Sequence, residues 1–337
     1  MAKLILTCDL CPGDIVMLTA AVRDLHLNYP GWHVTDVRTT CPELWENNPY
    51  LTPIADNDPE VEVIACEYPL VNESNTAPFH FVHGYSQFLG QRLGLEIRPT
   101  LFKGDVHLSD DERSWLSQVG EILGEEIPFW IIVSGGKRDY TTKWWSPERY
   151  QQVVDHFRGR LLFVQVGANS DPHPALQGVL DLRGQTTLRQ LVRLVHHSYG
   201  VLCPVTSLMH LAAAVECPSG RPALRPCVVV AGGREPPHWE AYSHHHFLHT
   251  LGALPCCEDG PCWRSRVQPE GDGSEHDQPQ WLCQDVRPGP LAHCMELIQA
   301  TDVIQRIEWC LTGGRQGSLS PDAARQVESG LRARGSW

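Results

Sequence analysis

Short apolar runs typical of β-strands alternate with helical periods along most of the chain. A strand expected at residues 3–8 precedes a helix at 14–27, and the alternation resumes at residue 129 and continues to residue 231. This pattern predicts parallel α/β domains. Composition agrees, since 42% hydrophobic and 20% charged residues allow a sizeable core. A chain of 337 residues exceeds what one core usually organises, so we expect two domains.

The element boundaries suggest where those domains divide. We expect an N-terminal domain at residues 1–120 and a second domain at 121–310, followed by a mobile tail at 311–337. An acidic helical stretch at 105–126, opened by the capping residue Ser109, joins the two domains. The expected strands lie at 34–37, 61–65, 129–133, 161–166, 201–203 and 227–231, and the further helices at 79–93, 147–157, 188–196 and 208–215.

Charge and targeting signals narrow the class of protein. Lys and Arg number 27 against 40 Asp and Glu, a formal net charge of −13, which argues against a nucleic-acid partner. The amino terminus has no signal-peptide pattern, and no stretch has the length of uncharged apolar residues that a membrane helix needs. We therefore expect a cytoplasmic protein. In a reducing compartment its 13 cysteines should be buried small hydrophobes or metal ligands rather than disulfides.

The periodicity stops between residues 255 and 290, a stretch rich in Gly, Pro, Asp, Glu and Cys. Cys257, Cys262, Cys283 and Cys294 have the spacing C-x4-C-x20-C-x10-C there. Four thiolates can bind zinc or iron, and the metal would supply folding free energy that a small core cannot. We therefore predict a metal-binding insert at 255–295. The alternative is a mobile loop with unpaired cysteines; Cys256 competes with Cys257 as a ligand, and His293 with Cys294.

Another histidine-rich stretch, His244–His246, allows two interpretations. It could belong to a second metal site, but a solvated loop is the simpler interpretation.

A carboxylate begins the first expected helix, in the run Cys11-Pro12-Gly13-Asp14. A residue that follows the first strand of an α/β domain faces the crevice where such folds bind ligands, which makes Asp14 a candidate catalytic residue. The alternative is that Asp14 only complements the positive end of the helix dipole.

Two further segments could contact phosphate. Ser134-Gly135-Gly136-Lys137 ends the first strand of the second domain, and Lys143 follows it; the glycines allow close backbone approach and the lysines supply point charges. The alternative is a glycine-rich turn with solvated lysines. The run from Pro204 to Ala214 leads a strand into a Thr/Ser cap and a small-residue helix, whose free N–H groups suit a diphosphate. His210 is either a ligand contact or a structural hydrogen-bonding residue.

Together these segments resemble glycosyltransferase family 9, the ADP-heptose heptosyltransferases. Gly13-Asp14 through Thr19 is similar to the family's first βα turn, and Lys143 to Glu148 to its Lys-x-Trp-Pro-Glu segment, with one extra residue. The run 181–188 resembles a Leu-x-Gly-x-[Ser/Thr]-[Ser/Thr]-Leu stretch. Residues 205–212 resemble Asp-[Ser/Thr]-Gly-x-x-His-x-Ala and are followed by Gly232-Gly233-Arg234-Glu235-Pro236.

The resemblance covers about residues 3–250 and implies a GT-B fold, two Rossmann-like domains facing across a cleft. Val205 and Ser207 depart from the family's Asp and Gly. This variant, with the late cysteines, looks like the autotransporter heptosyltransferase subgroup, which glycosylates serines of bacterial surface proteins and carries a four-cysteine iron site. That likeness favours a single structural iron, with zinc as the alternative.

By this resemblance the chain is an inverting transferase that moves a heptose from ADP-heptose, or a related nucleotide sugar, to a hydroxyl acceptor. Asp14 would be the base, and Gly13 would lie on the acceptor side. No catalytic divalent metal is expected, because the lysines and a helix N-terminus would hold the ADP. The residues that we assign to donor binding are Gly135, Gly136, Lys137, Lys143, Thr206, Ser207, Leu208, Met209 and His210.

Three functional hypotheses stay open. The acceptor is a serine of a surface protein, or it is a lipopolysaccharide core or another glycan. In the third, the chain is a non-catalytic nucleotide-sugar binder or a metal-dependent assembly module. In each case the cysteine site could also shape an acceptor surface or a contact between copies of the chain.

Overall fold

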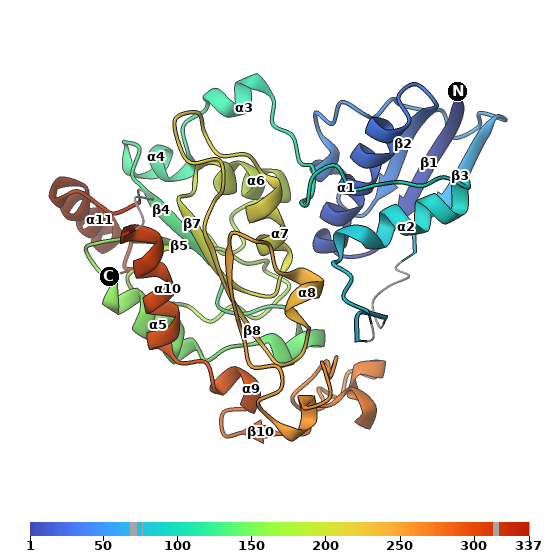
Figure 1. Ribbon diagram of the computed structural model, residues 1–337. Helices are drawn as coiled ribbons and strands as arrows, with labels where there is room; N and C mark the ends of the chain where they lie inside the picture. Colours follow the sequence, from blue (N-terminus) through green and yellow to red (C-terminus); the bar gives the residue numbers. More distant parts are fainter. Residues whose placement is uncertain (68–72, 76, 313–316, 337) are drawn as a thin grey trace.

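The computed structural model describes residues 1–67, 73–75, 77–312 and 317–336, and they form two α/β lobes (Figure 1). The first lobe holds a parallel sheet of order β2-β1-β3. Helix α1 follows β1 and supplies much of the core, because its residues 15–25 are all buried. The strands are β1 (Ala2–Cys8), β2 (His33–Thr39) and β3 (Val61–Ala65), and the helices α1 (Pro12–Asn28) and α2 (Val82–Leu93).

The second lobe holds a six-stranded parallel sheet of order β6-β5-β4-β7-β8-β9. The strands are β4 (Phe129–Ile132), β5 (Leu162–Gln165), β6 (Leu180–Asp181), β7 (Gly200–Pro204), β8 (Cys227–Gly232) and β9 (His245–His249). The helices are α5 (Pro147–His156), α6 (Leu188–His197), α7 (Ser207–Ala214), α8 (Pro237–Glu240), α10 (Ala300–Thr312) and α11 (Pro321–Ala333). Both lobes are thus the parallel α/β units that the alternating pattern predicts.

The strand order of the second lobe fixes where a ligand can bind. From β4 the chain moves outward to β5 and β6, then returns to place β7 on the other side of β4. The carboxyl ends of β4 and β7 therefore meet at the point where the strand order reverses, which is where open α/β sheets bind ligands. The two segments predicted to contact phosphate follow these two strands.

The connection between the lobes contains two short helices, α3 (Asp110–Ser114) and α4 (Gln118–Leu123). Ser109 caps α3 by accepting a hydrogen bond from the backbone N–H of Glu112, as the sequence predicts. The late cysteine-rich stretch contains the antiparallel pair β10 (Val286–Arg287) and β11 (Leu291–Ala292), the short helix α9 (His293–Glu296), and single 3-10 turns. It has little regular structure, consistent with the loss of periodicity there.

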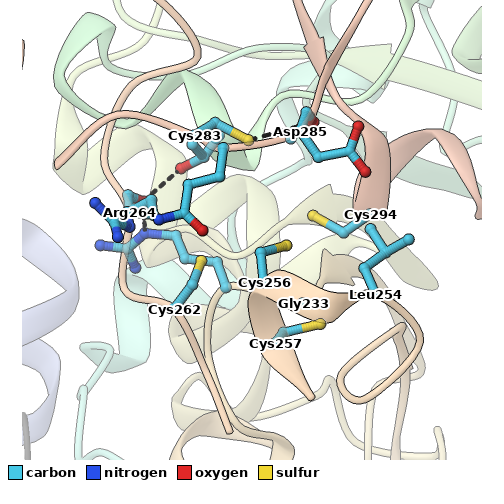
Figure 2. Close-up of a pocket in the computed structure, with 13 residues that line it drawn as sticks. Gly233, Leu254, Cys256, Cys257, Cys262, Arg264, Cys283, Asp285 and Cys294 are labelled. Carbon is cyan, nitrogen blue, oxygen red and sulfur yellow. Dashed lines mark hydrogen bonds between the residues drawn. The ribbon is translucent and has the colours of Figure 1, made fainter. Parts of the chain in front are cut away.

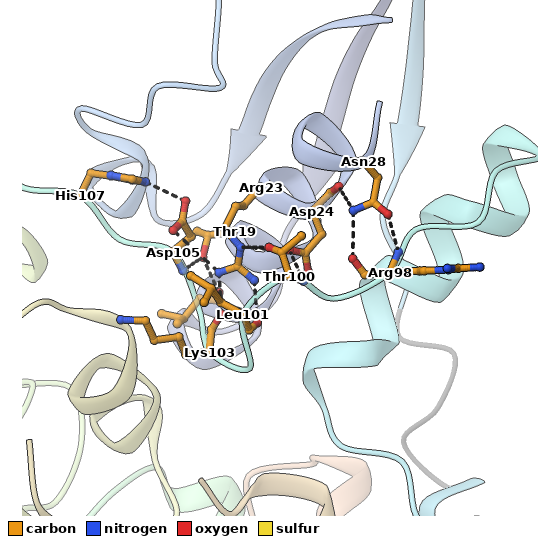
Figure 3. Close-up of polar contacts among 11 residues, drawn as sticks. Thr19, Arg23, Asp24, Asn28, Arg98, Thr100, Leu101, Lys103, Asp105 and His107 are labelled. Atoms are coloured by element: carbon orange, nitrogen blue, oxygen red, sulfur yellow. Dashed lines mark hydrogen bonds and ion pairs between the residues drawn. The ribbon is translucent and has the colours of Figure 1, made fainter. Parts of the chain in front are cut away.

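A buried ion pair on α1 anchors the segment that leads to the second lobe (Figure 3). Arg23 Nε lies 3.0 Å from Asp24 Oδ1, with both side chains at most 2% exposed. The Arg23 guanidinium also donates to the carbonyls of Leu101 and Lys103, at 2.8 Å each. Just beyond them, a Cβ on Gly104 would lie 3.1 Å from Ala214 Cβ of α7. Only glycine lets the connecting segment pass between the lobes so closely.

Two predictions about irregular regions are wrong. The His244–His246 run lies mostly in β9, which pairs with β8 along its length, rather than in a solvated loop. In place of the mobile tail expected at 311–337, helix α11 packs Val327 and Leu331 into the core, with Ser320 as its N-cap. Two apolar residues four positions apart were too weak a stripe to reveal this helix. Residues 313–316 and 337 of that tail lie outside the described residues.

Among the described residues, no helix combines the length and the apolar character that a membrane-spanning helix needs.

Candidate active site

Asp14 begins α1 at the carboxyl end of β1. Its Oδ2 accepts a hydrogen bond of 3.0 Å from the backbone N–H of Cys11, which is the N-cap, and Pro12 occupies the first turn. The carboxylate thus does complement the helix start, as the simpler interpretation holds. The same contact fixes its position at the carboxyl end of the first sheet, so the capping role and a catalytic role are compatible.

Gly13 marks the closest approach between the N-termini of α1 and α7. A Cβ on Gly13 would lie 3.3 Å from His210 Cδ2 and 3.5 Å from the Cα of Ser207. The absence of a side chain at residue 13 lets the two helix starts meet. The structure therefore brings Asp14 and the predicted diphosphate-binding helix to one place, although they lie almost 200 residues apart in the sequence.

The start of α7 carries a hydroxyl with no protein partner. Thr206 is the N-cap in an extended conformation, and its Oγ1 is buried without a hydrogen bond among the described residues. His210, one turn on, is buried and its Nδ1 lies 2.8 Å from the Tyr242 hydroxyl. Burial lowers the pKa of His210 to about 3, so the ring is neutral at physiological pH. The observed partner of His210 is a protein side chain, which agrees with the interpretation of His210 as a structural hydrogen-bonding residue.

The glycines after β4 have a packing role in the structure. A Cβ on Gly135 would lie 3.0 Å from the His173 Cα, and the backbone N–H of Gly136 donates to the Pro172 carbonyl at 3.2 Å. The loop thus passes tightly beside another backbone segment, which explains Gly135 without a ligand, whereas a Cβ on Gly136 would make only an ordinary contact, 3.6 Å from Trp144 Nε1. Lys137, next in the chain, reaches across to the first lobe and donates to Cys11 Sγ at 2.9 Å.

Lys143 ends the 3-10 helix η3 (Arg138–Lys143), in the loop between β4 and α5. Its ammonium lies 2.8 Å from Glu235 Oε1, and the side chain is 20% exposed. Burial and the neighbouring Arg234 guanidinium lower the pKa of Lys143 to about 7. Arg234 pairs with the same Glu235 carboxylate and lies over the Tyr140 ring, 5.1 Å from its centroid. Two cations therefore share one carboxylate beside the ends of β4 and β8.

Three charged residues near Lys143 were not predicted as site residues from the sequence: Arg234, Glu235 and Glu240. Glu235 and Glu240 are buried, and each has an Oε2 without a hydrogen bond in the described part of the chain. Burial raises the pKa of Glu240 despite the charges of Lys143 and Arg234. Buried polar atoms are normally hydrogen-bonded, so these oxygens fit a site that takes a polar ligand. The run Gly232-Gly233-Arg234-Glu235 after β8 was the only local signal for them.

The cysteines of the insert surround one small cavity (Figure 2). Five of them line it, because Cys256 joins Cys257, Cys262, Cys283 and Cys294. The cavity holds about 20 Å³, room for one occupant the size of a water molecule or an ion. Burial raises the pKa of Cys256 to about 11 and that of Cys294 to about 12. Within the described ranges, however, no three His, Cys, Asp or Glu side chains come together in a metal-binding arrangement. The thiol set suits iron or zinc, but the predicted four-cysteine site is not assembled.

Residues 75–220 match the family model for glycosyltransferase family 9 (heptosyltransferase). The matched stretch is less than half of the 337 residues. No curated protein matches the sequence. The chain is also similar to solved structures that are 13–14% identical to it in sequence. At such identities the likeness shows a shared fold, which here is the GT-B arrangement.

Three solved structures share this fold. The glycosyl transferase family 9 protein of Veillonella parvula DSM 2008 has a TM-score of 0.61 at 13% identity, covering 93% of this chain and 98% of that one. The ADP-heptose lps heptosyltransferase II of E. coli has a TM-score of 0.56 at 14% identity, covering 93% and 100%. The dodecameric iron-containing heptosyltransferase TibC, in complex with ADP-D-beta-D-heptose, has a TM-score of 0.60 at 13% identity, covering 92% and 76%.

The family match supports a glycosyltransferase, and the segments predicted to form its site can now be placed. Of the residues assigned to the donor, Lys143 and those at the start of α7 lie beside the switch point of the second sheet, and Asp14 faces them from α1. The family 9 match covers α7 but ends at residue 220, before Arg234 and the cysteines. The insert thus lies outside the matched stretch.

Proposed function

We propose that the chain is an inverting heptosyltransferase that uses ADP-heptose. The observation that carries this proposal is the meeting of the Asp14 end of α1 with the N-terminus of α7, next to Lys143. A carboxylate faces a helix N-terminus and an ammonium there, which suits a proton acceptor opposite a diphosphate leaving group. The likeness to the E. coli ADP-heptose lps heptosyltransferase II and to TibC in complex with ADP-D-beta-D-heptose supports the choice of donor.

In the proposed reaction the acceptor hydroxyl gives its proton to Asp14 as its oxygen bonds to the anomeric carbon. The bond from that carbon to the phosphate oxygen breaks, and ADP leaves with the bonding electrons. Lys143 and the backbone N–H groups at the start of α7 stabilise the charge that develops on ADP. We propose that Glu235 and Glu240, whose Oε2 atoms have no hydrogen bond among the described residues, accept hydrogen bonds from sugar hydroxyls.

For the acceptor we propose a serine of a bacterial surface protein, modified in the cytoplasm. Support comes from the net charge of −13, which disfavours approach to an anionic membrane surface where a lipid-linked glycan would lie. None of the 13 cysteines forms a disulfide bond in the structure.

The experiment offers purified protein ADP-heptose with either a surface-protein acceptor or a lipopolysaccharide core, and follows ADP release and the acceptor mass. We expect ADP release and a heptose mass increment on the protein. Transfer to the core alone would overturn the proposed acceptor. Donor binding by calorimetry without ADP release, in either mixture, would identify a non-catalytic binder instead.

We also propose that the insert holds a structural metal, iron before zinc, on Cys257, Cys262, Cys283 and Cys294, with Cys256 as an alternative to Cys257. The shared cavity supports it, as does the likeness to the iron-containing heptosyltransferase TibC. When bound, the metal would supply folding free energy to a segment with little regular structure.

Elemental analysis of purified protein tests this site. Cys283→Ser should lose the metal, whereas Cys217→Ser, a half-buried cysteine outside the cavity, should keep it. Comparing Cys256→Ser with Cys257→Ser decides which of the two is a ligand. Wild-type protein without stoichiometric iron or zinc would contradict the proposal.

A further inference from the structure

The insert contains an arginine whose charge is completely buried. The Arg266 side chain is 0% exposed, and its guanidinium contacts three carboxylates. Two of them, Asp272 at 2.8 Å and Asp277 at 2.6 Å, belong to the insert itself. The third, Asp139 at 2.6 Å, lies 127 residues earlier, in η3. The arginine therefore joins the insert to the loop that carries Lys143.

Burial of a lone guanidinium would be strongly unfavourable, so these contacts are a condition of its position. The Asp272 carboxylate, with Asp277 and Asp139, raises the pKa of Arg266, so its charge is permanent. Asp272 and Asp277 alone could neutralise that charge. The insert does not need the contact with Asp139 to balance the charge of Arg266. That contact instead fixes the loop that contains η3 against the insert.

Backbone contacts beside Arg266 connect the same two segments. The backbone N–H of Thr142 donates to the Ser265 carbonyl at 3.1 Å, and the Thr142 hydroxyl donates to the carbonyl of Arg264 at 2.7 Å. The backbone N–H of Val267 donates to the Thr141 hydroxyl at 2.9 Å. Residues 264–267 thus run alongside Thr141 and Thr142 in the last turn of η3. Lys143 directly follows Thr142 and ends that helix.

The same short segment also holds the second cation of the site. Arg234 Nε donates to the Arg264 carbonyl at 2.6 Å, and the Trp263 backbone N–H donates to the Arg234 carbonyl at 3.1 Å. On its other side the Arg266 carbonyl accepts from the backbone N–H of Cys283 at 2.7 Å. Residues 263–267 therefore contact the loop that carries Lys143, the loop that carries Arg234, and the cavity cysteine Cys283.

We propose that Arg266 is a positioning residue for the donor, which acts through Asp139 to fix η3 so that the Lys143 ammonium meets the diphosphate. This inference rests on the proposed function, since it takes Lys143 as a donor contact. Its consequence is that the insert, which the family match does not reach, sets the affinity for the nucleotide sugar.

The decisive variant is Asp139→Ala, which removes the acceptor and so cuts the link to the loop but leaves Arg266 with Asp272 and Asp277. We expect the KM for ADP-heptose and the calorimetric Kd for ADP to rise about tenfold, as for loss of one charge-assisted hydrogen bond to a fully buried arginine, with little change in kcat. The melting temperature should stay near that of the wild type. Arg266→Met should raise the Kd at least as much, and Arg266→Lys, which keeps the charge, should recover part of the loss.

The matched control is Arg138→Gln. Arg138 pairs with Glu270 at 3.2 Å and so joins the same loop to the same insert, but its side chain is 60% exposed. Exposed pairs contribute little, so donor affinity should not change. If the wild type binds ADP and the Asp139→Ala protein binds it equally well, the positioning role is wrong. If the wild type itself binds no ADP, the proposed function fails instead.

Discussion

The central strands of the second lobe and the cysteine-rich insert are neighbours, yet different forces stabilise them. Every residue of β4, β5, β7 and β8 is buried, so apolar packing holds these strands. The insert also buries Trp263 and Val267, but its largest fully buried side chain is the charged Arg266. The sheet positions the residues that follow its strands through its backbone geometry. The insert positions the adjacent loops through hydrogen bonds and ion pairs, such as that of Arg266 with Asp139.

This contrast divides the candidate site in two. Asp14 and the start of α7 lie at the ends of regular elements and inherit their positions from the sheets. Lys143 and Arg234 lie on loops that the segment 263–267 contacts. The first group should be insensitive to changes in the insert, and the second group should respond to them.

The largest effect is expected at the sheet-defined part of the site. Asp14→Asn should lower kcat by about 10²–10⁴-fold, because the amide cannot accept the acceptor proton. Its folding should be unchanged, since the amide oxygen can still accept from the Cys11 N–H. Steady-state transfer assays with circular dichroism measure both. Full activity in this variant would remove Asp14 from the mechanism.

The packing contrast is tested by one truncation in each region. Leu202→Ala in β7 removes a fully buried side chain and should lower the unfolding free energy by about 2–5 kcal/mol. Val267→Ala in the insert removes less buried apolar volume and should lower it by less. Denaturant unfolding followed by tryptophan fluorescence gives both values. Equal losses would mean that the insert is packed as the sheet is.

A smaller, pH-dependent effect is expected at Lys143, whose pKa burial and Arg234 lower to about 7. The protonated fraction falls as the pH rises through 7, so ADP affinity should fall about tenfold between pH 6 and pH 8. The charged groups near this ammonium are Glu235, Arg234, Glu240 and Asp14. Calorimetry across this range measures the effect, and Lys143→Arg should show no such slope. A flat wild-type profile would contradict the lowered pKa.

The smallest effect concerns a contact between the insert and the first lobe. Trp263 Nε1 donates to Asn75 Oδ1 at 2.6 Å. Asn75→Ala should reduce the unfolding free energy by about 1 kcal/mol, the usual net value of one hydrogen bond. Thermal melting measures it, with kcat of the variant expected to stay at the wild-type level. A large loss of kcat would show that this contact also orders the sheet-defined half of the site.

Much of the fold could be predicted because it depends on local patterns. β3 occupies Val61–Ala65 as expected, and α2 ends before Gly94, which adopts a left-handed φ of +67°. β9 escaped prediction because a histidine-rich strand at the edge of the sheet is formed by its pairing with β8, and its side chains give no alternating signal. α11 depends on two apolar residues that match the core only once the chain is folded.

The site divides in the same way. Asp14 and the α7 cap could be proposed from the sequence because each follows a recognisable strand. Arg266 could not, since its partner Asp139 lies 127 residues away and a lone arginine in an irregular stretch gives no periodic signal. The roles of Glu235 and Glu240 likewise depend on burial, which composition cannot reveal.

The contact at Gly13 also bears on how the two lobes can move. The starts of α1 and α7 touch there with only backbone on one side. Points near such a contact are displaced least when two rigid bodies rock against each other. Rocking of the lobes about this contact would therefore leave Asp14 and the start of α7 at almost the same separation. A methyl group at residue 13 would lie 3.3 Å from His210 Cδ2, so that the ring would have to shift slightly at this pivot.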